Sequence, residues 1–119
     1  MNIISSNGII RLHRGDTFQI PLYINESANL NMDYYDLTET DYVEFYLMSP
    51  NQKWEDALII KRYTGKDYDN NNDCIYITLT NSDTKDLEPA NYYYGIKLFK
   101  NNNEIVDTII PKTKFILLD

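Results

Sequence analysis

The sequence predicts an all-β fold, a sandwich of about seven or eight short strands, and three observations support this prediction. Apolar and polar residues alternate with a period of two in many short segments, which is typical of strands with one buried face. Clusters of Asn, Asp, Gly and Pro separate these segments, as turns require. No segment carries a helical pattern of useful length. With 119 residues, the chain is expected to form one domain, residues 1–119.

The alternation places the strands and the faces that they bury. In the second expected strand Phe18, Ile20 and Leu22 share one face, and Pro21 falls on the other. Because proline cannot donate a ladder hydrogen bond, we expect this strand at a sheet edge or at a bulge. Pro111 is expected to break the final strand into two. The expected strands are residues 9–13, 17–24, 42–48, 58–63, 74–80, 92–100, 104–110 and 113–118.

The connections follow from residues that favour turns. Arg14-Gly15-Asp16 predicts a hairpin turn rather than an adhesion motif, since Gly15 permits a positive φ and Asp16 can cap the bend. Asn101 to Asn103 predict a second hairpin turn, because Asn tolerates left-handed geometry. Residues 25–41 are the longest expected loop, residues 65–73 form an acidic hairpin tip, and single helical turns are expected at 55–57 and within 81–91.

A tyrosine near the start of the sixth expected strand makes the fold class more specific. Leu87 and Pro89 lead into Tyr92, which opens the alternating segment Tyr92-x-Tyr94. Immunoglobulin-like sandwiches place a tyrosine here, and its hydroxyl binds the backbone a few residues upstream. Tyr94 would then occupy the position of the second cysteine of antibody domains. We therefore expect an immunoglobulin-like antiparallel sandwich, with an ordinary strand tyrosine at position 92 as the alternative.

Composition excludes several classes of partner. The formal net charge is −7 and the pI is near 4.5. A nucleic-acid-binding protein usually carries a basic patch, and the largest basic clusters here are only Lys61-Arg62 and Lys112 with Lys114. We therefore expect no nucleic-acid partner, and the same charge argues against anionic membranes. The single cysteine, Cys74, excludes a disulfide within the chain and is expected to be a semi-buried strand residue.

The sequence shows no targeting segment. The first ten residues lack the charged and apolar regions of a signal peptide. No apolar run approaches the roughly 20 residues that cross a bilayer. We expect a soluble protein made in the cytoplasm.

Residues for catalysis are sparse. His13 is the only histidine, so neither a Ser-His-Asp or Cys-His arrangement nor a zinc site can be built with confidence. The chain has no glycine-rich phosphate loop. We expect a protein that is not an enzyme, with no catalytic residues and no cofactor.

One acidic segment resembles the start of a calcium loop. Hard Ca²⁺ prefers several oxygen ligands, but Asn72 stands where such a loop has glycine and Thr78 where it has a bidentate glutamate. A solvated hairpin tip is the favoured interpretation, so no metal is expected, and calcium binding stays open. The segment's alternating oxygen side chains are Asp67, Asp69, Asn71 and Asp73.

Several aromatic residues form the candidate binding site. Exposed aromatic faces stack on sugars, and Tyr and Trp also dominate protein interfaces. Packing within the fold is an equally good explanation of the same residues. The candidate platform consists of Trp54 with Tyr34, Tyr35, Tyr46 and Tyr63, together with Tyr42.

The order of motifs resembles the N-terminal immunoglobulin-like domain of phage baseplate upper proteins and related small prophage proteins of Gram-positive bacteria. The resemblance covers roughly residues 9–118. Ala90 replaces the family's usual glycine, and the chain stops where a baseplate protein continues. The motifs are Arg14-Gly15-Asp16-Thr17-Phe18, Leu37-Thr38, Val43-Glu44-Phe45, Asp83-Thr84-x-x-Leu87-x-Pro89, Tyr92-x-Tyr94-x-Ile96-x-Leu98, Asp107-Thr108 and Phe115.

The resemblance implies a structural module of a phage or prophage tail, baseplate or virion, acting by protein–protein binding. Its partners would be other phage structural proteins, with a homo-oligomer as one option. Such a protein would lie in the bacterial host cytoplasm during assembly and then in the virion. A carbohydrate-binding module that uses Trp54 and surface tyrosines is the alternative. Gly15, Asp16, Phe18, Leu87, Pro89, Tyr92 and Tyr94 are expected to have structural roles.

Overall fold

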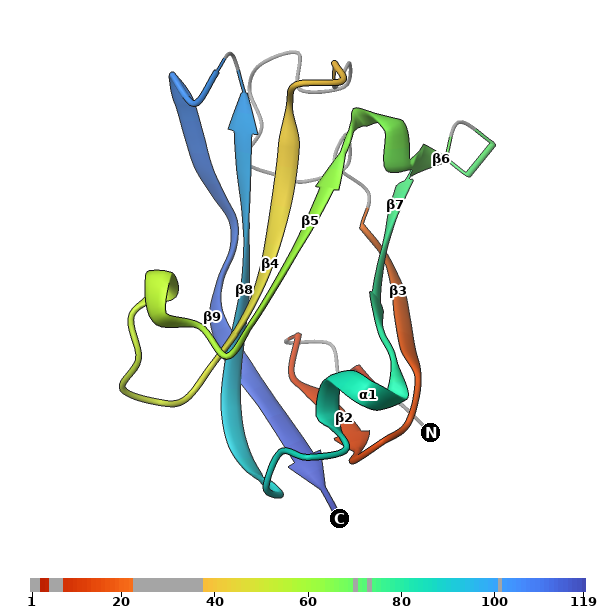
Figure 1. The fold of residues 1–119 in the computed structure, drawn as a ribbon, viewed down its shortest axis with the longest axis vertical. Helices are drawn as coiled ribbons and strands as arrows, with labels where there is room; N and C mark the ends of the chain where they lie inside the picture. Colours follow the sequence, from red (N-terminus) through yellow and green to blue (C-terminus); the bar gives the residue numbers. More distant parts are fainter. Residues whose placement is uncertain (1–2, 5–7, 23–37, 70, 73, 101) are drawn as a thin grey trace.

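The computed structural model describes residues 3–4, 8–22, 38–69, 71–72, 74–100 and 102–119 of the chain. These residues form a β-sandwich, which confirms the all-β prediction. The two sheets face each other across the core in Figure 1.

The larger sheet, sheet A, has six strands in the order β1-β2-β9-β8-β4-β5. Its inward residues come from every second position of the long strands, as the alternation predicts. Its strands are β1 (Ile3–Ile4), β2 (Ile10–His13), β4 (Tyr42–Met48), β5 (Ile59–Thr64), β8 (Ala90–Lys100) and β9 (Ile105–Leu118).

The smaller sheet, sheet B, has three strands in the order β3-β7-β6. They are β3 (Phe18–Leu22), β6 (Tyr68–Asp69) and β7 (Cys74–Leu79). Pro21 lies on β3, an edge strand with β7 as its partner, so the expected edge position is confirmed. Two short helical turns, η3 (Gly65–Asp67) and α1 (Asn81–Thr84), lie in connections between the sheets, and η2 (Trp54–Asp56) lies between β4 and β5 of sheet A.

The strand order is that of an immunoglobulin-like sandwich. Strands β9, β8, β4 and β5 correspond to G, F, C and C′, and strands β3, β7 and β6 correspond to B, E and D. The expected corner bond is present, since the Tyr92 hydroxyl donates to the carbonyl oxygen of Glu88 at 2.6 Å. Burial, and secondarily the charge of Glu88, raise the pKa of Tyr92, so this hydroxyl keeps its donated proton.

The sandwich is not wholly antiparallel as expected. Strand β2 runs parallel to β9, with Ile10 opposite Phe115 and Leu12 opposite Leu117. The two strands come from opposite ends of the chain and run toward the same end of the sandwich, where the Arg14 N–H donates to Leu118 O at 2.7 Å. Periodicity reveals that each segment is a strand but not in which direction its neighbour runs.

Two predicted hairpins are wrong because their flanking strands belong to different sheets. The turn at Gly15 leads from β2 in sheet A to β3 in sheet B, and residues 65–73 lead from β5 in sheet A to β7 in sheet B. The second connection also contains η3 and the short strand β6. A turn signal gives a change of direction, and only packing decides whether the chain returns to the same sheet.

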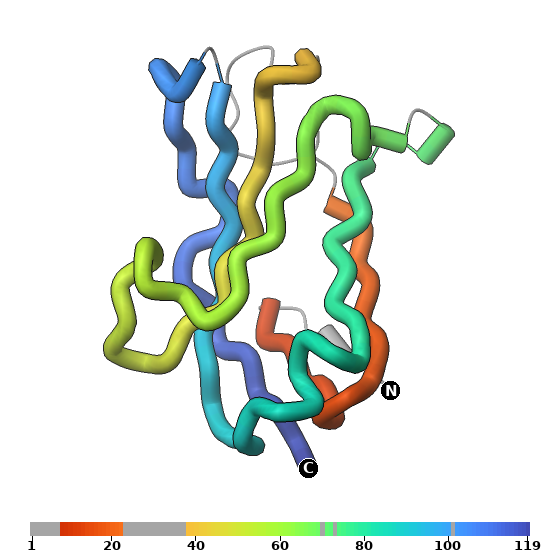
Figure 2. The backbone as a smooth tube through the Cα atoms, in the orientation of Figure 1, coloured from red at the N-terminus to blue at the C-terminus, as the bar shows by residue number. Residues whose placement is uncertain are grey.

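The predicted break at Pro111 is also wrong. Strand β9 continues from Ile105 to Leu118, and the trace of β9 bends midway (Figure 2). Its pairing with β8 is irregular between Tyr94 and Lys97. This irregularity lies beside Pro111, so a bulge accommodates the residue that cannot donate to the ladder.

The core between the sheets is filled by aromatic rings and aliphatic side chains. The rings of Phe45 and Tyr94 stack at 5.9 Å, and Phe115 lies 6.3 Å from Tyr94 and 6.4 Å from Phe18. Cys74 is fully buried rather than semi-buried. Aromatic packing thus occupies the middle of the sandwich, where antibody domains place a disulfide.

Candidate protein-binding face

The outward side of sheet A gathers aromatic, cationic and aliphatic side chains in neighbouring rows. Register places Thr64 and Phe99 beside Tyr42, and Arg62 and Lys97 beside Glu44. We call this side the outer face. Its residues include Arg11, Tyr42, Glu44, Tyr46, Met48, Ile60, Arg62, Thr64, Asn91, Tyr93, Gly95, Lys97, Phe99, Val106, Thr108, Lys114 and Ile116.

The first row is a stack of rings with a cation above it. Tyr42 and Phe99 are nearly parallel, with ring centroids 4.7 Å apart. The guanidinium carbon of Arg62 lies 4.1 Å from the Tyr42 centroid, on the ring face that attracts a cation. The Tyr42 hydroxyl donates to the side-chain oxygen of Asn103 at 2.9 Å. These contacts hold the row in a fixed arrangement.

Glu44 organises the second row. Arg62 donates to Glu44 Oε2 through Nη2 at 3.0 Å and through Nε at 3.1 Å. The Tyr46 hydroxyl donates to the other carboxylate oxygen at 2.6 Å. Burial first, and then the hydrogen bond and charge of Glu44, raise the pKa of Tyr46, which is only 6 % exposed. Both oxygens of this carboxylate are therefore engaged within the face.

Trp54 packs on the same face from the β4–β5 connection. Its ring meets Tyr46 edge-on at 5.1 Å, and the Lys97 ammonium lies 4.5 Å from its centroid. A Cβ at Gly95 would lie 2.2 Å from Trp54 Cη2, so the indole edge occupies the space of a missing side chain. The only tryptophan of the chain therefore anchors this connection to β8.

Three aliphatic side chains around this cluster remain exposed to solvent. They are Leu58 at 45 %, Ile60 at 46 % and Val106 at 49 %. Apolar groups of this size beside aromatic rings and arginine are typical of the buried parts of protein interfaces.

The predicted aromatic platform is only partly assembled. Trp54 and Tyr46 lie together on the outer face, with Tyr42 one row away. Tyr63 lies on the inward side of β5 and packs against the core. Tyr34 and Tyr35 lie outside the described residues.

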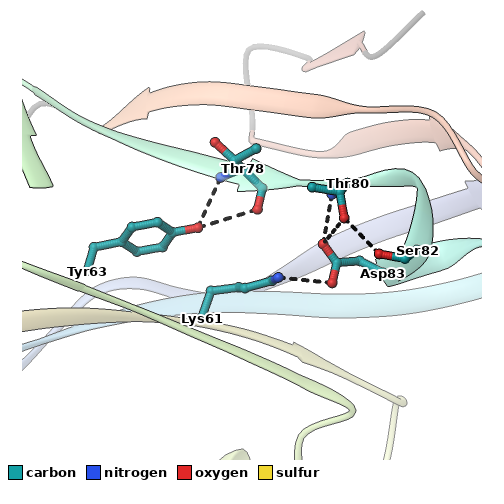
Figure 3. A network of polar contacts seen from close by, with 6 residues as sticks. All are labelled: Lys61, Tyr63, Thr78, Thr80, Ser82 and Asp83. Atoms are coloured by element: carbon teal, nitrogen blue, oxygen red, sulfur yellow. Dashed lines mark hydrogen bonds and ion pairs between the residues drawn. The ribbon is translucent and has the colours of Figure 1, made fainter.

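Tyr63 and Lys61 instead connect the two sheets (Figure 3). The Thr78 N–H donates to the Tyr63 hydroxyl at 3.1 Å, and this hydroxyl donates to the Thr78 carbonyl oxygen at 3.4 Å. Strand β6 pairs only with the start of β7, at Cys74 and Ile75. The tyrosine therefore supplies the polar partner that a longer neighbouring strand would have supplied to Thr78.

The second inter-sheet contact is an ion pair. Lys61 Nζ lies 2.9 Å from Asp83 Oδ1, while Asp83 Oδ2 accepts from the Thr80 N–H at 2.7 Å (Figure 3). Partial burial opposes ionisation of Asp83, but the Thr80 bond and Lys61 outweigh it and lower the pKa of the carboxyl. Asp83 thus completes the capping box of α1 with the N-cap residue Thr80 and also pairs with Lys61 of β5.

Two carboxylates of the acidic segment, those of Asp67 and Asp69, accept hydrogen bonds within the chain. Asp67 Oδ2 accepts from the Thr64 N–H at 2.8 Å. Asp69 accepts from the Asn72 side chain and from the backbone of Asn71 and Asn72, which lowers the pKa of Asp69. Among the described residues no three His, Cys, Asp or Glu side chains group as metal ligands do. Asp73, the fourth oxygen side chain of the segment, lies outside the described residues.

The expected scaffold residues at the first turn lie in fixed places. Gly15 has φ of +84°, its N–H donates to Thr84 Oγ1 at 2.9 Å, and its carbonyl accepts from Asn81 at 2.8 Å. The Asp16 N–H closes the turn on His13 O at 3.0 Å. This turn is therefore tied to α1.

The remaining scaffold residues flank the corner and the core. Phe18 and Tyr94 are buried, Leu87 packs against the core, and Pro89 is exposed just before β8. The Tyr94 hydroxyl donates to the carbonyl oxygen of Gly8. The motif residues are thus mainly parts of the scaffold.

Sequence reasoning missed most of the outer face. It concentrated on the inward set of β8 and left Tyr93, Gly95, Lys97 and Phe99 unused. Period-two alternation places these four residues on one face, so the signal was present. The contact between Trp54 and Gly95 had no comparable signal, because it joins segments 41 positions apart.

Within the described part of the chain no helix is long and apolar enough to span a membrane. Comparisons with family models, curated proteins and solved structures give no significant match.

Proposed function

We propose that this chain is a structural assembly module of a phage or prophage particle, where it binds other structural proteins and catalyses no reaction. The phage setting is supported by the order of sequence motifs, from the Gly15 turn to the Tyr92 corner. Among the motif residues that the structure describes, Gly15 lies at a turn, Phe18, Val43, Phe45 and Tyr94 are buried in the core, and Tyr92 forms the corner bond. A small rigid sandwich of this kind presents its sheet faces and loops to partners.

The binding role rests on one observation, the mixed outer face of sheet A. Leu58, Ile60 and Val106 are about half exposed beside an ordered set of rings and cations. The Tyr42–Phe99 stack is held before any partner arrives, so little side-chain entropy would be lost on binding. Preordered aromatic groups with arginine are the residues that most often dominate binding energy.

The geometry favours a protein partner over a carbohydrate. A sugar stacks on an open aromatic face, whereas Lys97 lies over the Trp54 ring and Gly95 lies against its edge. Tyr63, which the platform would also need, lies on the inward side of β5. Binding in a glycan array that is lost on Trp54→Ala, with the fold retained, would reverse this preference.

Mass spectrometry of phage particles tests the proposal. Particles induced from the source bacterium are purified on a density gradient, and we expect peptides of this chain at a fixed ratio to other virion proteins. If the chain is abundant in the lysate but missing from particles, the proposal fails.

Variants then test the surface. Ile60→Asp with Val106→Asp places charge on the outer face and is expected to give a folded chain that is depleted from particles. Gln19→Asp, an exposed position on the outward side of sheet B, is the matched control and should be incorporated normally. Equal incorporation of both would argue against the outer face as the contact surface.

A further inference from the structure

The outer face and the rest of the chain have opposite charge. The strand residues of this face include four cations, Arg11, Arg62, Lys97 and Lys114, and one carboxylate, Glu44. The full chain carries −7, so a face of +3 leaves −10 for all other positions. A copy of this chain is therefore an acidic partner for the outer face of another copy.

The face is large enough for a specific contact. The strands β2, β9, β8, β4 and β5 have 4, 14, 11, 7 and 6 residues, and at a rise of about 3.3 Å and a spacing of about 4.8 Å they cover about 670 Å². One partner of a standard interface contributes about 600–1,000 Å², so the face lies at the lower end of this range. The half-exposed Leu58, Ile60 and Val106 supply apolar area within or beside this surface.

We propose that the outer face of one copy binds an acidic surface of a second copy, head to tail. Two outer faces brought together would set +3 against +3, so a symmetric face-to-face pair is disfavoured. A head-to-tail contact places the cations against the acidic remainder of the neighbour and leaves one outer face free at the end. Such a contact is heterologous and continues into a ring or a filament. This inference deepens the assembly role proposed above and names the partner.

Sedimentation velocity of the purified chain tests the inference. At an ionic strength of about 0.05 M we expect species larger than dimers to grow as the concentration rises to about 200 µM, and about 0.5 M salt to reduce them. Lys114→Glu, an exposed position on the outer face opposite Tyr93, should weaken association at least about fivefold.

The matched control is Lys66→Glu, which makes the same charge change away from the outer face. Lys66 is 69 % exposed, and its ion pair with Glu39 is long, at 3.9 Å, so the substitution should leave the fold unchanged. We expect this variant to associate as the wild type does. Circular dichroism establishes that both variants are folded.

Mixing separates the head-to-tail arrangement from a symmetric one. A Lys114→Glu chain keeps its acidic surface, so it should cap growing wild-type oligomers and shorten them. Association that stops at a dimer, or equal weakening by Lys114→Glu and Lys66→Glu, overturns the proposal. A wild-type chain that stays monomeric also overturns it, and binding of a single-stranded DNA oligonucleotide through Lys114 would then assign the cations to nucleic acid.

The outcome is independent of the particle experiment. A monomeric chain that is present in particles would remove self-association and retain the assembly role. A chain that self-associates but is missing from particles would retain self-association and remove the proposed role in the particle.

Discussion

Gly95→Ala is the most direct test of how the outer face is built. The added Cβ would lie 2.2 Å from Trp54 Cη2 and 2.6 Å from Cζ3, so the indole must retreat by about 1.2 Å to reach ordinary contact at 3.4 Å. Overpacking of this kind costs about 1–3 kcal/mol. Replacing a strand glycine by alanine returns about 0.5–1 kcal/mol. We therefore expect a net destabilisation of about 1–2 kcal/mol.

A double-mutant cycle isolates the contact. In a Trp54→Ala background the clash with the indole is gone, and Gly95→Ala should stabilise the chain by about 0.5–1 kcal/mol. The expected coupling free energy between the two positions is the clash itself, about 1–3 kcal/mol, measured by urea unfolding with circular dichroism. Trp54 is the only tryptophan, so its fluorescence emission should shift to the red in Gly95→Ala alone.

Backbone crowding at position 95 is the alternative cause of a destabilisation by Gly95→Ala. The same Cβ would also lie 3.1 Å from the carbonyl oxygen of Ile110, which does not move with Trp54. An equal loss of stability with and without the indole would show that backbone crowding is the cause. Unchanged fluorescence in Gly95→Ala would lead to the same conclusion.

Three further predictions concern the polar contacts of the scaffold. Tyr92→Phe removes the hydrogen bond from the Tyr92 hydroxyl to Glu88 O and should lower the free energy of unfolding, measured in urea, by about 1–2 kcal/mol. An unchanged free energy of unfolding would mean that this bond does not stabilise the fold. Tyr63→Phe leaves the Thr78 N–H without its tyrosine partner and should cost about 1–2 kcal/mol, with faster amide exchange at that residue. Asp83→Asn should destabilise the chain at neutral pH by about 1 kcal/mol. Because folding lowers the pKa of Asp83, its stabilisation is present above the ordinary value of 3.8 and is lost as the pH falls through the folded value.

Matched measurements make these predictions specific. Tyr93→Phe, on the outward side of β8, is the control for the corner and should leave stability nearly unchanged. The stability difference between the wild type and Asp83→Asn should shrink below about pH 4, whereas a constant difference down to pH 2 would mean that the charge is not responsible. If the Thr78 amide exchanges its hydrogen equally slowly in Tyr63→Phe and in the wild type, water replaces the tyrosine hydroxyl as its partner.

The polar links between the sheets also bear on assembly. Lys61 and Tyr63 project from β5, the edge strand of sheet A, and both reach sheet B or its connection to α1. They hold the edge of sheet A against the opposite sheet. The outer face, on the other side of the same strand, is thereby supported from behind.

The sequence by itself determined the fold class and most of the strands. Alternation predicted β4 at residues 42–48 with Val43, Phe45 and Leu47 inward, and all three are fully buried. The Leu87 to Tyr94 segment predicted the corner of an immunoglobulin-like sandwich. These features are local, because strand periodicity and turn chemistry act over a few residues.

Only the tertiary structure decided which strands pair and what lies on the outer face. The parallel pairing of β2 with β9, the change of sheet at Gly15 and the continuity of β9 through Pro111 all depend on packing between distant segments. The same holds for Trp54, whose edge fills the space above Gly95. An alternating pattern fixes which side chains share a face, but it carries no information on which neighbour each face meets.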